Sequence, residues 1–328
     1  MRNKFLLPSL VVAVIIFGAF LPFMAKASSP DDITVTTVPN NPTPGQNTTV
    51  TLSSYVDDLN SVSISWSVNG KKISSGIGDK SVSLTAPALG GKTTVIATIS
   101  LSDGDLNETI TIKPSIMTLL WQANDSYIPP FYEGKAMPSP DSEVKIVALP
   151  EIKNGASFVN PTNMTYDWQL DGTNDENNSG YGKNYFTYVS DYLDNSNNVN
   201  VTATTLDQQD STSGSIDVST ISPKIEFYKN DPTLGTIWEQ ALENGHQVTG
   251  NEIFQAAPYF ISPKNLRIPF LNFAWSINDA QVSVPIYSNN LLPVATQAGT
   301  SGTAKIDLTV NNIHDLVQTA SKEINVNF

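Results

Sequence analysis

The sequence predicts an all-β protein in which three two-sheet β-sandwich domains follow one another along the chain. Three observations support this prediction. Polar and apolar residues alternate over many short segments, one tryptophan-centred element occurs three times, and the segment up to Ala27 differs sharply in composition from the rest. The predicted organisation is a signal peptide or membrane anchor at 1–27, followed by domains at 28–113, 114–221 and 222–328.

The N-terminal segment has the pattern of a secretory signal peptide. Arg2 and Lys4 give it a positive start, residues 5–24 carry no charged side chain, and the sequence AKA at 25–27 is typical of a cleavage site. The apolar stretch of about 20 residues is also long enough to span a bilayer. We therefore expect residues 1–27 to be cleaved or to remain as a membrane anchor. In both cases the rest of the chain is extracytoplasmic, either secreted or at the cell surface.

The composition excludes several classes of function. Lys and Arg total 18 against 31 Asp and Glu, which gives a net charge of −13, so a nucleic-acid backbone or an anionic membrane surface would be repelled. A membrane is therefore expected to be contacted only through the N-terminal segment, if that segment is uncleaved. The absence of cysteine excludes disulfide scaffolds, thiolate metal sites and cysteine nucleophiles. A secreted chain without cysteine favours a bacterial or archaeal source over an animal cell surface.

Strand patterns dominate the chain beyond residue 30. Residues 61–68 alternate strictly between polar and apolar side chains, and residues 93–101, 198–204 and 304–310 show similar patterns rich in Val, Ile and Thr. Clusters of Gly, Pro, Asn and Asp separate these segments at short intervals, as a sandwich requires. One short helix is predicted at 236–245, where a helix-favouring run ends in Asn-Gly.

The strongest internal signal is a repeat centred on tryptophan. The sequences WSVNG, WQLDG and WSIND begin at Trp66, Trp168 and Trp275, so the element recurs at nearly equal intervals. The pattern is typical of a strand that enters a tight turn, because Asn, Asp and Gly tolerate the positive φ of a hairpin. The three tryptophans are predicted to be core anchors, one in each domain. The alternative is that they are exposed and bind sugar rings.

The second and third domains are predicted to carry an aromatic insert. The interval from Ile33 to Trp66 is clearly shorter than the matching intervals at 116–168 and 225–275. We interpret the inserts as joints, in which a strand bends and a short helical cap packs on the sandwich end. The alternative is a ligand or partner surface of exposed aromatic rings. The candidates for that surface are Trp121, Tyr127, Phe131, Tyr132, Tyr228 and Trp238.

These features resemble bacterial immunoglobulin-like and PKD-like tandem β-sandwich surface modules. Residues 32–113 carry the resemblance best: the sequence PNNPTPG at 39–45, a strand at 48–52, WSVNG at 66–70 and a strand at 95–99 follow the order of such a module. The resemblance implies three immunoglobulin-like domains. It also implies a role at the cell surface, which in similar proteins is connected with pilus or envelope assemblies.

The sequence contains few residues suited to catalysis or metal binding. His246 and His314 belong to no metal-binding pattern and are predicted at the surface, and no nucleophile or phosphate-loop motif occurs. The loop at 171–178 is rich in oxygen ligands, so Asp171, Asp175 and Glu176 form a weak Ca²⁺ candidate, against the alternative of a solvated hairpin loop. No other cofactor is expected.

The predicted function is therefore structural or adhesive rather than enzymatic. We expect a rod of β-sandwich modules that presents or spaces a surface for an envelope or surface protein, or for an extracellular glycan. Two alternatives remain. One is a carbohydrate-binding module, which would display a row of exposed aromatic side chains. The other is a set of accessory domains of a secreted hydrolase, which would show a concave pocket with converging acids or a histidine.

Overall fold

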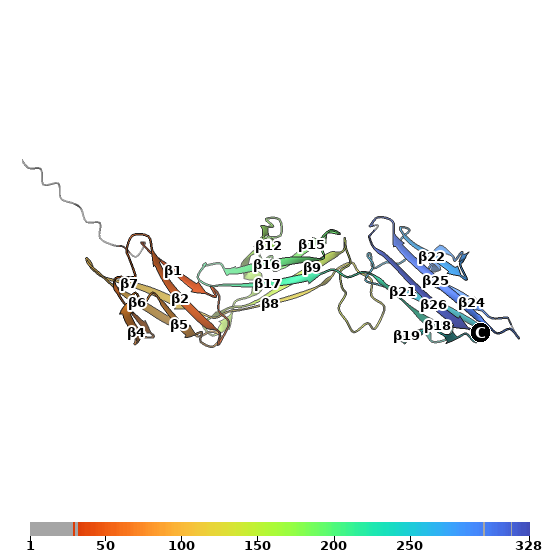
Figure 1. Ribbon diagram of the computed structural model, residues 1–328, viewed down its shortest axis with the longest axis horizontal. Coiled ribbons are helices and arrows are strands. Elements are labelled where there is room, and N and C mark those ends of the chain that lie inside the picture. Colours follow the sequence, from red (N-terminus) through yellow and green to blue (C-terminus); the bar gives the residue numbers. More distant parts are fainter. Residues whose placement is uncertain (1–28, 30–31, 298, 316) are drawn as a thin grey trace, which may run out of the picture. The chain divides into compact units, whose positions relative to one another are not determined.

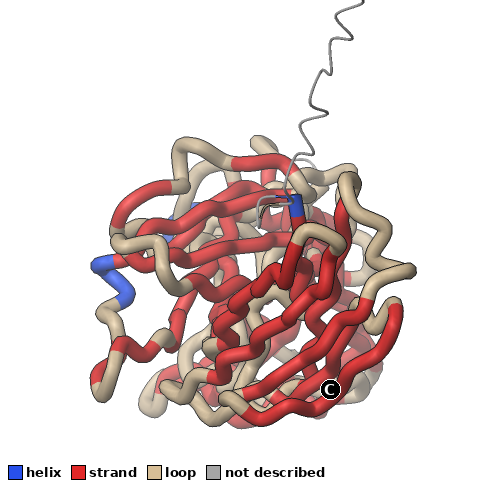
Figure 2. Tube along the Cα trace, turned by 90° about the vertical axis from the view of Figure 1, so that its left-hand side faces the viewer, coloured by secondary structure: helices blue, strands red, loops and turns tan. Residues whose placement is uncertain are grey.

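The structure is a computed structural model that describes residues 29, 32–297, 299–315 and 317–328. The predicted signal peptide or anchor lies outside the described residues. Strands make up nearly all of the regular structure, and the helical elements are short 3-10 turns such as those at Pro161–Asn163 and Ile286–Ser288 (Figure 2). The part of the chain that the structure describes is all-β, as predicted.

Residues 33–112 form two sheets (Figure 1). One has the strand order β1 (Ile33–Val38), β2 (Asn47–Ser54), β5 (Ser81–Thr85). The other has the order β4 (Lys71–Ile77), β3 (Ser63–Val68), β6 (Thr93–Leu101), β7 (Gly104–Ile112).

Residues 116–219 form two larger sheets and a small hairpin. The first sheet has the order β15 (Tyr185–Val189), β9 (Glu143–Glu151), β8 (Ile116–Ala123). The second has the order β13 (Thr173–Asn174), β12 (Met164–Leu170), β16 (Ser196–Thr205), β17 (Ser211–Ser219), with β14 (Gly180–Tyr181) also on β12. The hairpin is β10 (Lys153–Asn154) with β11 (Ser157–Phe158).

Residues 224–327 form the last two sheets. The first has the order β19 (Gly235–Ala241), β18 (Lys224–Asp231), β21 (Asn251–Tyr259), β24 (Leu291–Ala295). The second has the order β20 (His246–Gln247), β26 (Thr319–Asn327), β25 (Thr303–Asn312), β22 (Leu271–Ile277), β23 (Ala280–Val282), in which β20 and β26 are parallel.

By compactness, the chain divides into two units. Of the described residues, the first unit comprises those within 1–36, 51–82 and 95–110, and the second unit comprises those within 37–50, 83–94 and 111–328. The predicted boundaries after residues 113 and 221 fall between β7 and β8 and between β17 and β18, where the sheets change. The division into three domains stays a prediction.

The three repeat tryptophans are buried, with exposed fractions of 0, 0 and 1% for Trp66, Trp168 and Trp275. Each indole N–H donates to a backbone carbonyl farther along the chain, at 2.7–2.9 Å. In the second unit the ring also stacks on a phenylalanine of the facing sheet, 5.3 Å from Trp168 to Phe186 and 5.5 Å from Trp275 to Phe227. Each tryptophan therefore fills a core and also satisfies its one polar atom.

The turns after these tryptophans have the predicted geometry. A two-residue hairpin turn of type I′ needs positive φ at both central residues. The central pairs have φ of 47° and 80° at Asn69-Gly70, 50° and 78° at Asp171-Gly172, and 49° and 66° at Asn278-Asp279.

The helix predicted at 236–245 is wrong, because this segment contains strand β19. Thr236 pairs with Asn230 of β18, and Ala241 pairs with Tyr228 across a β-bulge. The segment opens with Thr236, Ile237 and Trp238, which favour strands, and the backbone partners offered by β18 override the helix preference of the Glu-Gln-Ala-Leu-Glu run.

Candidate functional site

The loop between β8 and β9, residues 124–142, contacts the segment that follows β21. Phe260 N donates to Tyr127 O at 2.7 Å, and Tyr127 N donates to Ile261 O at the same distance. Ser262 Oγ donates to Asp125 Oδ2 at 2.6 Å. These two main-chain hydrogen bonds hold Tyr127 against residues 260 and 261. We call the contact of residues 124–142 with residues 259–262, 312–315 and 317–318 the clasp.

Aromatic rings form one side of the clasp. Tyr132 meets Tyr259 and Phe260 edge to face, at centroid distances of 5.5 and 5.9 Å. The Tyr228 and Tyr259 hydroxyls lie 2.5 Å apart, and the Tyr228 ring is 5.0 Å from that of Trp238. Such pairs stabilise beyond their buried area.

Burial controls the ionisation of these phenols. Tyr127 packs against the core of residues 225–326, and burial raises the pKa of its phenol to about 12. Burial also raises the pKa of Tyr259, with a further increase from its hydrogen bond to Tyr228. Both phenols are therefore neutral at physiological pH, and the Tyr259 hydroxyl shares a hydrogen bond with that of Tyr228.

Buried polar side chains form the other side of the clasp. The Gln318 side chain is fully buried, accepts from Ser262 N at 2.8 Å and donates to Pro140 O at 2.7 Å. Asn312 Nδ2 donates to Ser262 O at 2.8 Å. Burial raises the pKa of the nearby Asp141 carboxyl, and the negative charges of Asp315 and Asp191 raise it further. Because buried amides cost free energy when unpaired, these bonds favour one arrangement of the loop.

The six aromatic candidates for a partner surface have different environments. Tyr127, Tyr132, Tyr228 and Trp238 take part in the contacts of the clasp or pack directly beside them. Trp121 packs against the core of residues 144–218, and the Lys135 ammonium lies 3.6 Å from its ring centroid. The Phe131 ring is 88% exposed. The structure thus brings four of the six together, within the chain.

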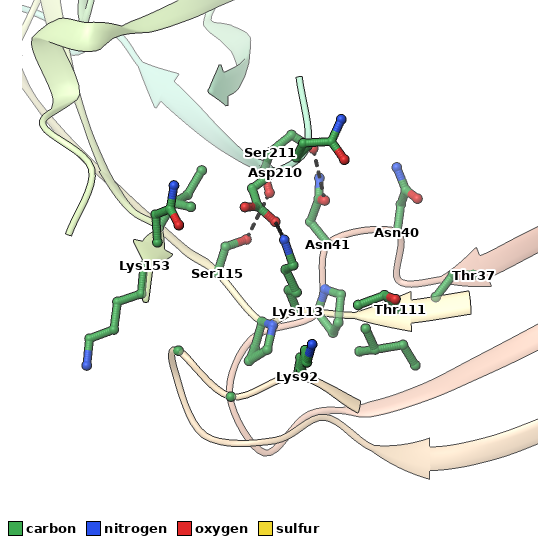
Figure 3. Close-up of a pocket in the computed structure, with 18 of the residues that line it drawn as sticks. Thr37, Asn40, Asn41, Lys92, Thr111, Lys113, Ser115, Lys153, Asp210 and Ser211 are labelled. Carbon is green, nitrogen blue, oxygen red and sulfur yellow. Dashed lines mark hydrogen bonds and ion pairs between the residues drawn. The ribbon is translucent and has the colours of Figure 1, made fainter. Parts of the chain in front are cut away.

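A second feature of the second unit is a polar pocket of about 650 Å³ (Figure 3). Five segments line it, within residues 37–42, 90–92, 111–115, 152–155 and 209–211. This pocket was not predicted from the sequence, because no motif joins residues from five separated segments.

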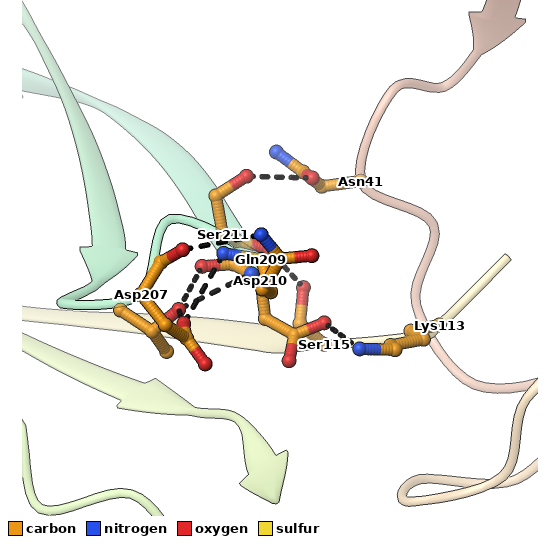
Figure 4. Close-up of polar contacts among 8 residues, drawn as sticks. Asn41, Lys113, Ser115, Asp207, Gln209, Asp210 and Ser211 are labelled. Atoms are coloured by element: carbon orange, nitrogen blue, oxygen red, sulfur yellow. Dashed lines mark hydrogen bonds and ion pairs between the residues drawn. The ribbon is translucent and has the colours of Figure 1, made fainter. Parts of the chain in front are cut away.

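Hydrogen bonds and one ion pair hold the pocket wall (Figure 4). Lys113 Nζ lies 2.7 Å from Asp210 Oδ1. Ser115 Oγ donates to Ser211 O at 3.1 Å, and Ser211 Oγ donates to Asn41 Oδ1 at 3.2 Å. Ser115 N also donates to the carbonyl of Pro42 at 3.1 Å. The wall is therefore linked across three of the five segments.

The neighbouring turn at 207–210 is fixed by its own carboxylate. Asp207 Oδ1 accepts from Thr205 Oγ1 at 2.6 Å and from Gln209 N at 3.2 Å. These two hydrogen bonds, in that order, hold the pKa of the Asp207 carboxyl below its ordinary value. The turn that carries Asp210 is thus ordered by local bonds.

The carboxylates of the Ca²⁺ candidate loop bond to amides of the loop and of its neighbours. Asp171 accepts from Asn197 Nδ2 at 2.9 Å and from Asn198 N at 2.7 Å. Asp175 accepts from the side chain and the backbone of Asn178, and these two bonds lower the pKa of its carboxyl. Glu176 is exposed. Within the described ranges, no three His, Asp or Glu side chains gather in a group suited to a metal ion.

The histidines are in two different environments. His314 is exposed and stacks on Phe270, with 4.4 Å between centroids. His246 is only partly exposed, and its Nε2 lies 2.8 Å from Oε2 of the buried Glu252, whose Oε1 lies 2.9 Å from Lys229 Nζ. This cluster was not predicted from the sequence, because the three residues lie on three different strands.

In the part of the chain that the structure describes, no helix has the length and apolar character needed to cross a membrane.

Comparison with known proteins gives only remote similarities. No family model and no curated protein matches the sequence. Solved structures that match include the fibronectin(III)-like modules of Clostridium thermocellum CbhA, with 18% identity, coverage of 57% of this chain and 93% of that chain, and a TM-score of 0.28. Three N-terminal domains of the bacteriophage RB49 outer capsid protein Hoc show 9% identity, coverage of 90% and 97%, and a TM-score of 0.24. Sidekick-1 immunoglobulin domains 1–5 show 9% identity, coverage of 87% and 56%, and a TM-score of 0.30. At these TM-scores, the architecture of the chain rests on its own strand pairing.

Proposed function

We propose that this chain is a non-enzymatic extracytoplasmic protein, a rod of β-sandwich modules that spaces and presents a surface for a protein or glycan partner. The clasp is the observation that carries the proposal. It joins the loop after β8 to the segments after β21 and β25 through two main-chain hydrogen bonds, one aromatic cluster and buried amides. A contact of this kind resists bending, which a spacer needs and a flexible linker does not provide.

The proposed location is the cell surface or the medium, with pilus or envelope components as partners. The signal-peptide pattern at 1–27 supports export. The strongly acidic composition supports a protein or glycan partner over nucleic acid.

The location is tested with a membrane-impermeant lysine reagent applied to intact host cells. Lys71 and Lys72 are exposed on β4 and serve as reporters. We expect both to be modified to the same extent in intact and lysed cells, or the protein to be recovered from the medium. Modification only after lysis would contradict the proposal. Cross-linking in the same cells then identifies the partner, which we expect among envelope components.

A further inference from the structure

The polar pocket of the second unit differs in charge from the rest of the molecule. Three lysines, Lys92, Lys113 and Lys153, line it together with one acid, Asp210, so its charged side chains sum to +2 (3 − 1). The whole chain has a net charge of −13. A concave positive site on an acidic protein focuses the field and attracts small anions, while the surrounding surface repels large ones.

Two of the three lysines are available for a ligand. Lys113 is paired with Asp210. Among the described residues, no carboxylate lies within ion-pair distance of the Lys92 or Lys153 ammonium. The Lys153 ammonium lies 5.1 Å from the Phe158 ring, a weak contact that an anion can compete with.

The backbone places Lys153 against the pocket. Gly90 has φ of 85°, and a Cβ built on it would come within 2.7 Å of Lys153 Cδ. The absence of a side chain at Gly90 therefore lets the Lys153 stem run close along the loop at 90–92.

The remaining lining matches a polyhydroxylated ligand. Thr37, Asn40 and Thr111 offer hydroxyls and an amide that both donate and accept hydrogen bonds (Figure 3). Asn154 adds a second amide. No aromatic residue is among the described residues that line the pocket, so stacking on a sugar face is not its mode of recognition. A volume of about 650 Å³ lies within the usual range for small-ligand sites, roughly 300–1,000 Å³.

We propose that this pocket binds an acidic oligosaccharide, with Lys92 and Lys153 holding its carboxylate or sulfate groups and the amides and hydroxyls holding its sugar hydroxyls. The inference rests on the proposed function, since it names the glycan class that the presented surface takes. An ion pair and a hydrogen bond order the pocket wall before the ligand binds; they join Lys113 to Asp210 and Ser115 to Ser211 (Figure 4).

The test is isothermal titration calorimetry with the full chain, solubilised in a nonionic detergent. The probes are tri-galacturonic acid, a sulfated chondroitin disaccharide and neutral cellotriose. We expect at least one acidic probe to bind and cellotriose to bind at least about tenfold more weakly. Raising the salt from about 20 to about 300 mM should weaken binding of the acidic probe several-fold, because exposed charges are screened beyond the Debye length.

Two matched double variants identify the site. The Lys92→Gln and Lys153→Gln pair, which leaves the Lys113–Asp210 ion pair in place, should lower the affinity for the acidic probe at least about tenfold. The Lys71→Gln and Lys72→Gln pair makes the same charge change on β4 and should leave the affinity unchanged. Equal thermal transitions in both variants show that folding is intact.

Each outcome of this experiment is decisive for the pocket. Binding of tri-galacturonic acid alone would show that the pocket prefers carboxylate groups, and binding of the sulfated disaccharide alone would show that it prefers sulfate groups. Binding of both would show that the pocket recognises the negative charge rather than one acidic group. Failure of both acidic probes, equal binding of cellotriose, or an equal loss in both double variants would overturn the inference. None of these results would change the surface labelling of Lys71 and Lys72, which tests the proposed function separately.

Discussion

Replacement of Trp168 with alanine is expected to lower the free energy of unfolding of the core at 144–218 by about 4 kcal/mol. The indole is fully buried and stacks 5.3 Å from Phe186, so its loss leaves a large cavity. It also removes the donor to Lys183 O. Hydrogen exchange measured on peptides of β9 and β16 should show protection reduced by about a thousandfold, which is that free energy expressed as a rate ratio.

Trp121 provides the control in the same group of sheets. It lies on β8, partly buried beneath Lys135, so Trp121→Ala should cost only about 1 kcal/mol. If Trp168→Ala proves too unstable to purify, Trp168→Phe should fold and give an intermediate loss. Equal losses for Trp168→Ala and Trp121→Ala would show that the repeat tryptophans are not core anchors.

Acid is expected to destabilise the core at 225–326 through Glu252. Burial alone would raise the pKa of this carboxyl, but hydrogen bonds from His246, Lys229 and Thr249 together lower it from 4.5 to about 2. Because the folded pKa lies below the unfolded one, the stabilisation is complete above pH 4.5 and is lost as the pH falls to about 2. The shift corresponds to about 3 kcal/mol, and we expect about 2 kcal/mol because Lys229 is 39% exposed and partly screened by solvent.

Glu252→Gln isolates this contribution from those of the other carboxylates. Urea unfolding of the core at 225–326 should show the variant to be about 2 kcal/mol less stable than the native protein near pH 6. The difference should disappear near pH 2. Glu226→Gln, which removes a partly exposed ion pair with Lys322, should change stability by less than about 1 kcal/mol at either pH. A stability difference for Glu252→Gln that is independent of pH would refute the assignment.

The repeat made the central hairpins predictable. A tryptophan followed two positions later by an apolar residue and then by Asn-Gly, Asp-Gly or Asn-Asp specifies both a core position and the turn that follows it. Asn69 and Asp171 adopt the positive φ that this pattern requires, as do the residues that follow them. Local chemistry of this kind depends on few distant contacts, so the sequence alone indicates it.

Strand β19 shows where local reasoning fails. The run after Trp238 has the composition of a short helix, yet Thr236 and Ala241 pair with β18. The partner strand lies in another segment, and its free edge offers hydrogen bonds that outweigh differences in propensity of a few tenths of a kcal/mol per residue.

The candidate sites were predicted only in part. An insert that acts as a joint was inferred from its length and aromatic content, and Tyr127 and Tyr132 do pack on the segment after β21. Gln318 and Asn312, which complete the clasp, lie far from these tyrosines along the chain and have no distinctive local pattern. The same reason explains why the lysines of the pocket were missed.

The clasp fixes the loop at 124–142 relative to the segments after β21 and β25, as a spacer requires. The chain has no cysteine, so nitroxide labels can be placed uniquely by Thr118→Cys on β8 and Ser321→Cys on β26, both exposed sites. Pulsed electron–electron double resonance should give a single narrow distance distribution, which broadens when Gln318→Ala is added. A broad distribution in the otherwise native chain would contradict the claim.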